Sequence, residues 1–210
     1  MLRLRHLQGL AVLAGLAAGC SAGLDDAPPG VGPNGVETPF AVSNYFAPSG
    51  YMGDGAGGTA LTATTGGATC ATRPEGARGD CYRFSYEAGT QLWAGVYWQF
   101  PPNNWGSAEG KKIAPGATQV SFWAAGAAGG EPLKVVIGGI HDVTLPHSDT
   151  LKAETEVMLT TEMTHYTIDL AGQTYEKVIG GFSWYTHYAE GTNPSTAAPI
   201  VVFLDDIVWE

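Results

Sequence analysis

Strand-like runs of apolar residues follow one another along most of the chain. Between residues 119 and 125, Val120, Phe122 and Ala124 fall on one side of the chain and the intervening residues fall on the other. A period of two is typical of a β-strand with one buried face. Runs bounded by Gly, Pro or Asn predict strands at residues 81–87, 91–100, 119–125, 133–137, 154–159, 165–170, 177–185 and 200–209.

These intervals favour an all-β fold. No window of twelve or more residues has the period of a helix. About 170 residues fit a single β-sandwich or jelly roll of about eight to ten mostly antiparallel strands. Residues 45–55 are turn-rich and aromatic, and residues 56–69 are almost entirely Gly, Thr and Ala. We expect a loop in the first segment and extended or loop structure in the second.

The strand predicted at residues 91–100 has two unlike faces. One face has the composition of a core and holds Ala94, Val96, Trp98 and Phe100. The other mixes aromatics with an amide and a glycine and holds Trp93, Gly95, Tyr97 and Gln99. The second composition is typical of a surface that stacks on a ligand and hydrogen-bonds to its edges.

A loop with a tryptophan follows this strand. Its sequence begins Pro-Pro-Asn-Asn, and Trp105 comes next, where no regular structure would bury it. We therefore expect Trp105 to contact a ligand. Asn103 and Asn104 either hydrogen-bond to that ligand or merely form the turn.

The first nineteen residues have the pattern of a signal peptide. A basic start precedes an apolar run that is too short to span a bilayer. The run ends in Leu16-Ala-Ala-Gly-Cys20, which resembles the lipobox of bacterial lipoproteins, although Ala17 stands where that family usually has Leu. The resemblance implies that Cys20 is acylated and anchors the protein in the bacterial outer membrane or at the cell surface. The alternative is an ordinary secreted protein.

The chain after Cys20 divides into two parts. Residues 20–38 are rich in Gly, Pro, Ala and Asp and predict a flexible tether, followed by one domain at residues 39–210. Within that domain, Cys70 and Cys81 are separated by ten residues. An even pair in an oxidising compartment predicts a disulfide, which would contribute about 2–3 kcal/mol. A metal thiolate site would need closer spacing and further ligands.

The charge of the chain excludes one class of partner. The formal net charge is −10; removal of Arg3 and Arg5 with the signal leaves 8 basic against 20 acidic residues, or −12. Such a surface repels nucleic acid. It is compatible with neutral ligands, with calcium, or simply with solubility.

Four segments, taken together, resemble a known family; they lie at residues 94–106, 122–131, 180–184 and 202–210. They resemble the galactose-binding-like β-sandwich (jelly-roll) domains that serve as non-catalytic carbohydrate-binding modules, often beside glycoside hydrolases. The resemblance covers about residues 40–210. It implies a β-sandwich that binds a polysaccharide or oligosaccharide.

The resemblance also implies a structural calcium ion, because such modules often supply an aspartate from the last strand. That position corresponds to Asp205 or Asp206, and alternation places Asp205 on the inward face with Phe203. Calcium takes six to eight oxygens, and the glycine-rich loop around Asp54 could supply several. The alternative is that Asp205 accepts hydrogen bonds from a neighbouring loop.

Sugar recognition relies on flat aromatics and a few placed polar groups. The aromatic candidates are Trp93, Tyr97, Trp105 and Trp123, with Trp184 or Tyr185. The hydrogen-bonding candidates are Gln99, Asn103, Asn104 and Glu131. Core packing is the competing explanation for each tryptophan, and for Trp98 we prefer it.

Catalysis has weaker support. The chain has no Gly-x-Ser-x-Gly motif, and His141, Asp142 and His147 match no metal-binding spacing. A glycosidase pair of Glu131 with Asp149 or Asp205 depends on a separation that sequence does not give. We assign no catalytic residue and predict a non-catalytic carbohydrate-binding lipoprotein. The alternatives are a jelly-roll glycoside hydrolase or polysaccharide lyase, and a structural surface lipoprotein without a sugar site.

Overall fold

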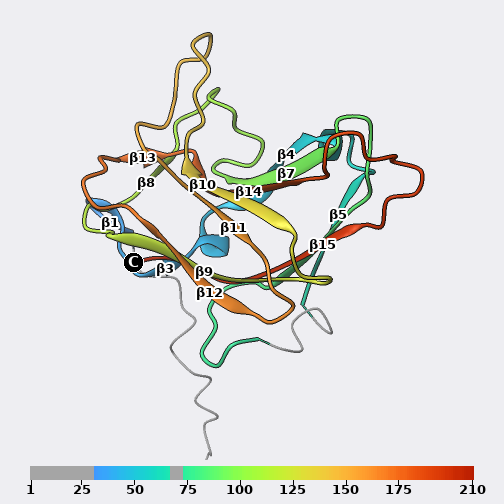
Figure 1. The fold of residues 1–210 in the computed structure, drawn as a ribbon. Coiled ribbons are helices and arrows are strands. Elements are labelled where there is room, and N and C mark those ends of the chain that lie inside the picture. The colour runs from blue at the N-terminus through green and yellow to red at the C-terminus, as the bar shows by residue number, and fades with distance from the viewer. Residues whose placement is uncertain (1–30, 67–72) are drawn as a thin grey trace, which may run out of the picture.

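Two facing β-sheets form the molecule in this computed structural model, which describes residues 31–66 and 73–210 (Figure 1). One sheet has the order β11-β10-β14-β7-β4, and the other has the order β12-β9-β15-β6-β5, with β3 beside β15. The first comprises β4 (Ala47–Gly53), β7 (Trp93–Gln99), β10 (Pro132–Gly138), β11 (Lys152–Met158) and β14 (Gly180–His187). The second comprises β3 (Phe40–Ala41), β5 (Leu61–Thr65), β6 (Tyr82–Tyr86), β9 (Gln119–Gly126), β12 (Thr164–Asp169) and β15 (Ile200–Trp209).

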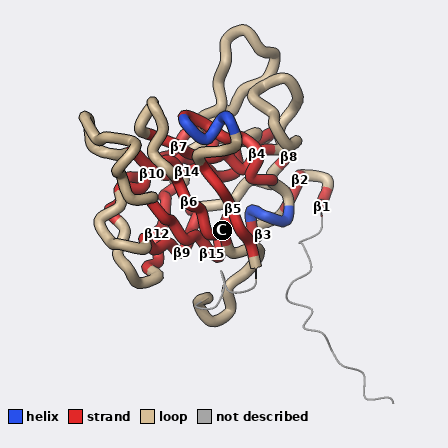
Figure 2. Tube along the Cα trace, turned by 90° about the vertical axis from the view of Figure 1, so that its right-hand side faces the viewer, coloured by secondary structure: helices blue, strands red, loops and turns tan. Residues whose placement is uncertain are grey.

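Small elements complete the fold. β1 (Val31–Gly32) pairs with β2 (Gly35–Val36), and β8 (Lys111–Lys112) pairs with β13 (Lys177–Val178). The described residues contain two short 3-10 helices, η2 (Val42–Asn44) and η3 (Asp54–Gly57). Figure 2 shows strands as the main regular structure, with the two short helices beside them. The predicted all-β sandwich of antiparallel strands is confirmed, and none of the helices in the described residues is long and apolar enough to cross a membrane.

The strands predicted after residue 80 are all present, and one of them is divided into two strands. The run at residues 177–185 splits into β13 and β14, which belong to different sheets. Two strands of five or more residues, β4 and β5, were not predicted, and neither were the two-residue strands β1, β2, β3 and β8. The segment that we expected to be a turn-rich loop forms β4, and part of the Gly/Thr/Ala segment forms β5. Each lies at the edge of a sheet, where a weakly patterned strand needs only one partner.

The folded part also begins earlier than predicted. Residues 31–38, expected to belong to the tether, include the β1–β2 hairpin. Val36 is fully buried in the core and forms a parallel bridge with Ile113. The predicted start of the domain at residue 39 is therefore wrong. One buried apolar side chain within a Gly/Pro-rich segment forms no repeating pattern from which a strand could be predicted.

Large aromatics fill the space between the sheets. Trp98 is fully buried, as predicted, and donates from Nε1 to Tyr82 Oη at 3.3 Å. Its ring packs edge-on against Phe182, with a centroid distance of 5.4 Å. Trp209 donates from Nε1 to the Gly181 carbonyl at 2.8 Å, so this indole also keeps a polar partner in the core.

The last strand departs from the predicted faces. Val202 and Leu204 are buried in the core, whereas Phe203 is half exposed on the outer face. A register shift between Asp205 and Val208, with Asp206 at φ 45°, then changes the alternation. The prediction that Phe203 faces the core is therefore wrong, whereas Asp205 is buried, with 2% of its surface exposed.

Candidate functional site

The outer face of the sheet containing β7 presents a row of aromatics. Tyr97 pairs with Ser183 of β14, and Gly95 pairs with Tyr185. A Cβ on Gly95 would lie 2.6 Å from Tyr185 Cβ, so the glycine makes room for the tyrosine. The Tyr185 ring meets Trp93 edge-on at 6.1 Å. The alternation predicted for residues 93–97 thus brings Trp93 and Tyr97 to the outer face of the sheet beside Tyr185, where Trp93 is partly exposed and Tyr97 is 9% exposed.

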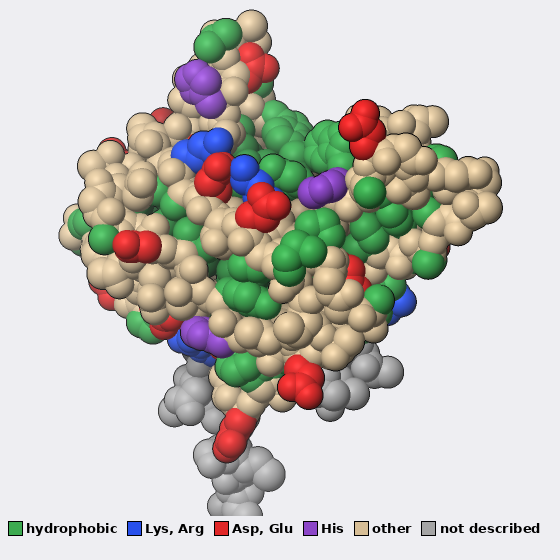
Figure 3. Space-filling view, viewed as in Figure 1, with side chains coloured by type: hydrophobic (Ala, Val, Ile, Leu, Met, Phe, Trp, Pro, Cys, Tyr) green, Lys and Arg blue, Asp and Glu red, His purple; other side chains and the backbone are tan. Residues whose placement is uncertain are grey.

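These side chains line a shallow, mostly apolar hollow of about 350 Å³, which we call the platform. It crosses four neighbouring strands: β4, β7, β14 and β10. Figure 3 shows hydrophobic side chains gathered in a depression on this side of the molecule, beside a projecting loop. The platform residues are Met52, Trp93, Tyr97, Val136, Ser183 and Tyr185.

A second hollow, which we call the end pocket, adjoins the platform. It has a volume of about 360 Å³ and shares Tyr97 with the platform. Trp105 is 39% exposed, and its ring meets Tyr97 edge-on at 5.7 Å. The end-pocket residues are Tyr97, Trp105, Gly139, Ile140, His141 and Asp142. The structure thus joins two of the predicted ligand residues, Tyr97 and Trp105, in one wall.

Asn104 holds the loop that carries Trp105. Its side chain is almost completely buried and donates from Nδ2 to the carbonyls of Phe100 (3.0 Å) and Ala108 (2.8 Å). Its Oδ1 accepts from the N–H groups of Gly106 (3.0 Å) and Ala108 (3.1 Å). Asn104 therefore organises the turn, which was the alternative to ligand contact.

Gln99 and Asn103 belong to the same scaffold. Gln99 is fully buried and donates from Nε2 to the Asn104 carbonyl at 2.9 Å. Its Oε1 accepts from the Ser49 hydroxyl at 3.1 Å, and that hydroxyl accepts from Asn103 N–H at 2.8 Å. A buried amide whose oxygen and nitrogen both have protein partners is not available to a ligand, so the prediction for Gln99 is wrong. Asn103 is exposed at the loop tip.

The projecting loop between β10 and β11 forms the other wall of the end pocket. The Asp149 carboxylate accepts from the N–H groups of Ile140 (3.0 Å), Ile179 (2.6 Å) and Gly180 (3.2 Å). Burial raises the pKa of this carboxyl, against the effect of these three hydrogen bonds. His147 N–H donates to the Gly106 carbonyl at 3.1 Å. The loop is thereby fixed both to β14 and to the loop of Trp105.

Three predicted ligand residues lie elsewhere. Trp184 is fully buried against Phe84, at a centroid distance of 4.9 Å, so the prediction that it contacts a ligand is wrong. Trp123 lies on the other sheet, where its ring is 5.1 Å from His165. Glu131 lies at the β9–β10 turn, almost buried, and accepts from Ala128 N–H. Trp123 and Glu131 therefore lie outside the platform.

Sequence reasoning missed several members of the site. Met52 was placed in a loop, although it lies on β4, opposite Gly95. Val136 and Ser183 come from two further strands, whose neighbours on the sheet cannot be read from a single sequence. His141 and Asp142 were considered only for metal binding or catalysis. Alternation within residues 133–137 would have marked Val136 as sharing a face with Lys134.

Charged residues bound the platform on the β10–β11 side. Glu154 forms ion pairs with Lys134 (3.0 Å) and Lys152 (3.1 Å). The Lys134 ammonium also lies 5.9 Å from the centre of the Tyr185 ring. Both lysines thus share one carboxylate at the edge of the apolar surface.

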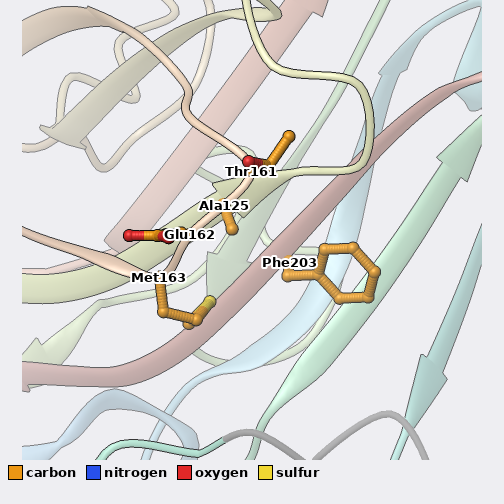
Figure 4. A pocket seen from close by; sticks show the side chains of 5 residues that line it. All are labelled: Ala125, Thr161, Glu162, Met163 and Phe203. Carbon is orange, nitrogen blue, oxygen red and sulfur yellow. The ribbon is translucent and has the colours of Figure 1, made fainter.

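The opposite sheet has a third hollow, of about 370 Å³, between β9, β15 and the segment before β12 (Figure 4). Phe203 is its single aromatic, and the Glu162 side chain points away from that ring. The other lining residues are Ala125, Thr161 and Met163. Because stacking on sugar needs several flat rings, the platform is the stronger candidate.

The carboxylates proposed for calcium do not form one site. Asp205 pairs with the Arg73 guanidinium at 2.8 Å, and Asp206 accepts from Arg78 N–H at 2.8 Å. Asp54 accepts a hydrogen bond from Tyr86 Oη at 2.6 Å. Tyr86 ends β6, whereas Asp205 lies beside the start of that strand, so the two carboxylates are at opposite ends of β6. No group of three or more potential metal ligands occurs within residues 31–66 and 73–210. The contacts fit the alternative, in which a neighbouring loop satisfies Asp205.

The acidic residues considered for glycoside cleavage also have other tasks. Asp149 is occupied by three backbone donors, and Asp205 by Arg73. Glu131 belongs to a turn on neither wall of the end pocket. The arrangement therefore supports binding better than acid–base chemistry.

Comparisons with known proteins return carbohydrate-binding modules. A family 30 carbohydrate-binding module has 13% identity and a TM-score of 0.48, with 82% of this chain and 83% of that chain covered. A family 11 module from a cellulosomal cellulase of Clostridium thermocellum has 11% identity and a TM-score of 0.43, with coverage of 83% and 95%. A family 61 module in complex with β-1,4-galactotriose has 15% identity and a TM-score of 0.42, with coverage of 79% and 88%. No family model matches the chain, and no curated protein matches it.

The partners of Asp205 lead to a prediction about stability. Asp205→Ala should lower the free energy of unfolding by about 2–4 kcal/mol, because it leaves the Arg73 guanidinium without its partner. Chelation of calcium with EGTA should leave the melting temperature of the natural protein unchanged. Both are measured by thermal and urea unfolding. A melting temperature that falls with EGTA and recovers with added calcium would contradict this assignment.

The role of Asn104 gives a second prediction. Asn104→Asp keeps the shape of the side chain but removes two donors and places a carboxylate against two carbonyls. We expect a loss of about 1–3 kcal/mol in unfolding free energy. The fluorescence of Trp105 should also shift toward that of exposed indole. This contribution is obtained by subtracting the spectrum of the same protein carrying Trp105→Phe. The exposed neighbour offers a control, since Asn103→Asp should leave both quantities nearly unchanged.

Proposed function

We propose that this protein binds a neutral polysaccharide on the outer face of the β7 sheet and does not cleave it. The observation that carries the proposal is the row of aromatics that lines the platform, in which Trp93 and Tyr185 are partly exposed and Tyr97 is 9% exposed, continued by the exposed Trp105 in the adjoining end pocket. A pyranose ring has an apolar face of C–H groups that packs on flat aromatic rings. Tyr and Trp supply such rings together with polar atoms at their edges.

The composition of the platform supports a neutral ligand. Its surface is mainly apolar, with the Ser183 hydroxyl and the tyrosine hydroxyls as polar groups. The Ser183 hydroxyl donates to the Val136 carbonyl and is almost completely buried, so it helps to hold the sheet beneath the ligand. Lys134 and Lys152, at the edge of the platform, both form ion pairs with Glu154. Neither lysine is therefore an unpaired cation beside the ligand. Stacking, with few hydrogen bonds, favours modest affinity.

A test of this function begins with a glycan array and affinity gels containing soluble polysaccharides. Tyr97→Ala should weaken the binding of each retained glycan at least about tenfold, because Tyr97 belongs to both hollows. Trp93→Ala should weaken it by a similar factor. The matched control is Trp123→Ala, which removes a tryptophan from the opposite sheet and should leave affinity unchanged.

Three outcomes would contradict the proposal. Unchanged affinity in both platform variants would place the site elsewhere. Release of reducing ends or unsaturated products would favour a glycoside hydrolase or a polysaccharide lyase. Failure to retain any glycan would favour a structural surface protein, in which the aromatics only pack.

We also propose that the protein is displayed on a membrane through lipid on Cys20. The signal-like first nineteen residues and the lipobox-like segment support this, and both lie outside the described residues. A surface-anchored module would hold a polysaccharide beside the cell. The proposed Cys70–Cys81 disulfide suits that compartment; Cys81 is buried beside the start of β6, and Cys70 lies outside the described residues.

The anchor can be tested in a bacterial host. The full chain should incorporate radiolabelled palmitate and partition into detergent, and Cys20→Ser should abolish both, because the thiol is the site of acylation. The matched control is Cys81→Ser, which leaves the lipobox-like segment intact. Incorporation of label into the Cys20→Ser protein would show that the anchor is wrongly placed.

A further inference from the structure

The two hollows lie in different directions from Tyr97. The platform extends across the strands, from Met52 on β4 to Val136 on β10. Strands are about 4.8 Å apart, so this path is roughly 14 Å long. The end pocket instead extends along the strands. Its residues follow the carboxyl ends of β7 and β10, which run in the same direction because both are antiparallel to β14.

A ligand that follows the platform does not enter the end pocket. A chain crossing the strands passes over Tyr97 and continues toward β10. The projecting loop stands beside that path and is fixed by Asp149 and by the His147–Gly106 hydrogen bond. A group that enters the end pocket must therefore leave the main chain sideways, at the sugar unit that stacks on Tyr97.

Building on the proposed function, we propose that the end pocket binds a single neutral sugar branch, so that the protein recognises a substituted polysaccharide. The main chain lies on the platform, and the branch packs against Trp105 and Ile140. The pocket is large enough for a small ligand group, and it combines apolar walls with a few polar side chains.

Asp142 and His141 supply the hydrogen bonds to the branch. Asp142 Oδ1 accepts from Thr144 N–H (2.8 Å) and from the Thr144 hydroxyl (2.6 Å), which hold the carboxylate in place. Both bonds use Oδ1, so Oδ2 can accept from a sugar hydroxyl. The Thr144 hydroxyl lowers the pKa of the Asp142 carboxyl, and the ionised group disfavours an acidic branch. The branch is therefore expected to be neutral.

The test uses pairs of oligosaccharides with the same main chain. Suitable pairs are cello-oligosaccharides with xyloglucan oligosaccharides, linear with galactosylated manno-oligosaccharides, and linear with arabinosylated xylo-oligosaccharides. Titration calorimetry gives the affinity for each member. In at least one pair the branched member should bind about tenfold more tightly than the linear member, a factor within reach of one or two well-placed hydrogen bonds and a stacked ring.

Variants assign the preference to the end pocket. His141→Ala, Asp142→Asn and Trp105→Ala should each bring the ratio of branched to linear affinity close to one. Val143→Ala is the matched control, because Val143 lies in the same loop, is 86% exposed and lines neither hollow. That variant should keep the natural ratio.

The outcomes separate this inference from the proposed function. Equal affinity for both members of every pair would overturn the branch assignment while leaving glycan binding in place. A branch preference that survives all three variants would also overturn it, because recognition would then occur outside the end pocket. If no member of any pair binds and the array retains nothing, both proposals fail.

Discussion

The burial of one face of β7 is the constraint on which the site depends. Ala94, Val96 and Trp98 are all fully buried between the sheets. Because side chains alternate along a strand, this burial obliges Trp93 and Tyr97 to face outward. A slip of one residue against β14 would place Tyr97 in the core and Trp98 in water, which the loss of buried aromatic area makes very costly. The core therefore sets the direction of the side chains on the outer face of β7.

Buried polar side chains fix the shape of the loops, as the core fixes the orientation of the strands. Asn104 and Asp149 each bind several backbone groups that would otherwise lack partners in a closed loop. Such groups are costly to leave unpaired, so each loop has a strongly preferred shape. Trp105 needs this support, since its ring is partly exposed and packs edge-on against Tyr97. The end pocket is thus built by residues that need not contact a ligand.

Sequence predicted what depends on local alternation and missed what depends on bulges and tertiary contacts. The faces of β7 were predicted correctly for residues 93–98 because the alternation there is unbroken, whereas Gln99, assigned to the ligand face, is buried by its contacts with the following loop. β4 was missed because a bulge between Pro48 and Gly50 interrupts its pairing. The bulge in β15 likewise follows a stretch whose faces were assigned in the wrong order. Trp184 was assigned to the surface because composition alone does not tell which face of β14 meets the core. The role of Asn104 depends on the folded loop that surrounds its side chain, and hydrophobic periodicity does not predict the shape of a loop.

In the proposed function, the platform supplies most of the affinity and the end pocket supplies the specificity. Stacking on the platform is tolerant, since any pyranose that offers an apolar face can pack on Tyr97 and its neighbours. Discrimination between glycans needs groups that some sugars satisfy and others do not, because a desolvated polar group without a partner is penalised. Asp142 and His141 are the polar side chains that the projecting loop brings to the end pocket. Selectivity is therefore expected to arise there, on a loop, while the rigid sheet supplies most of the contact area.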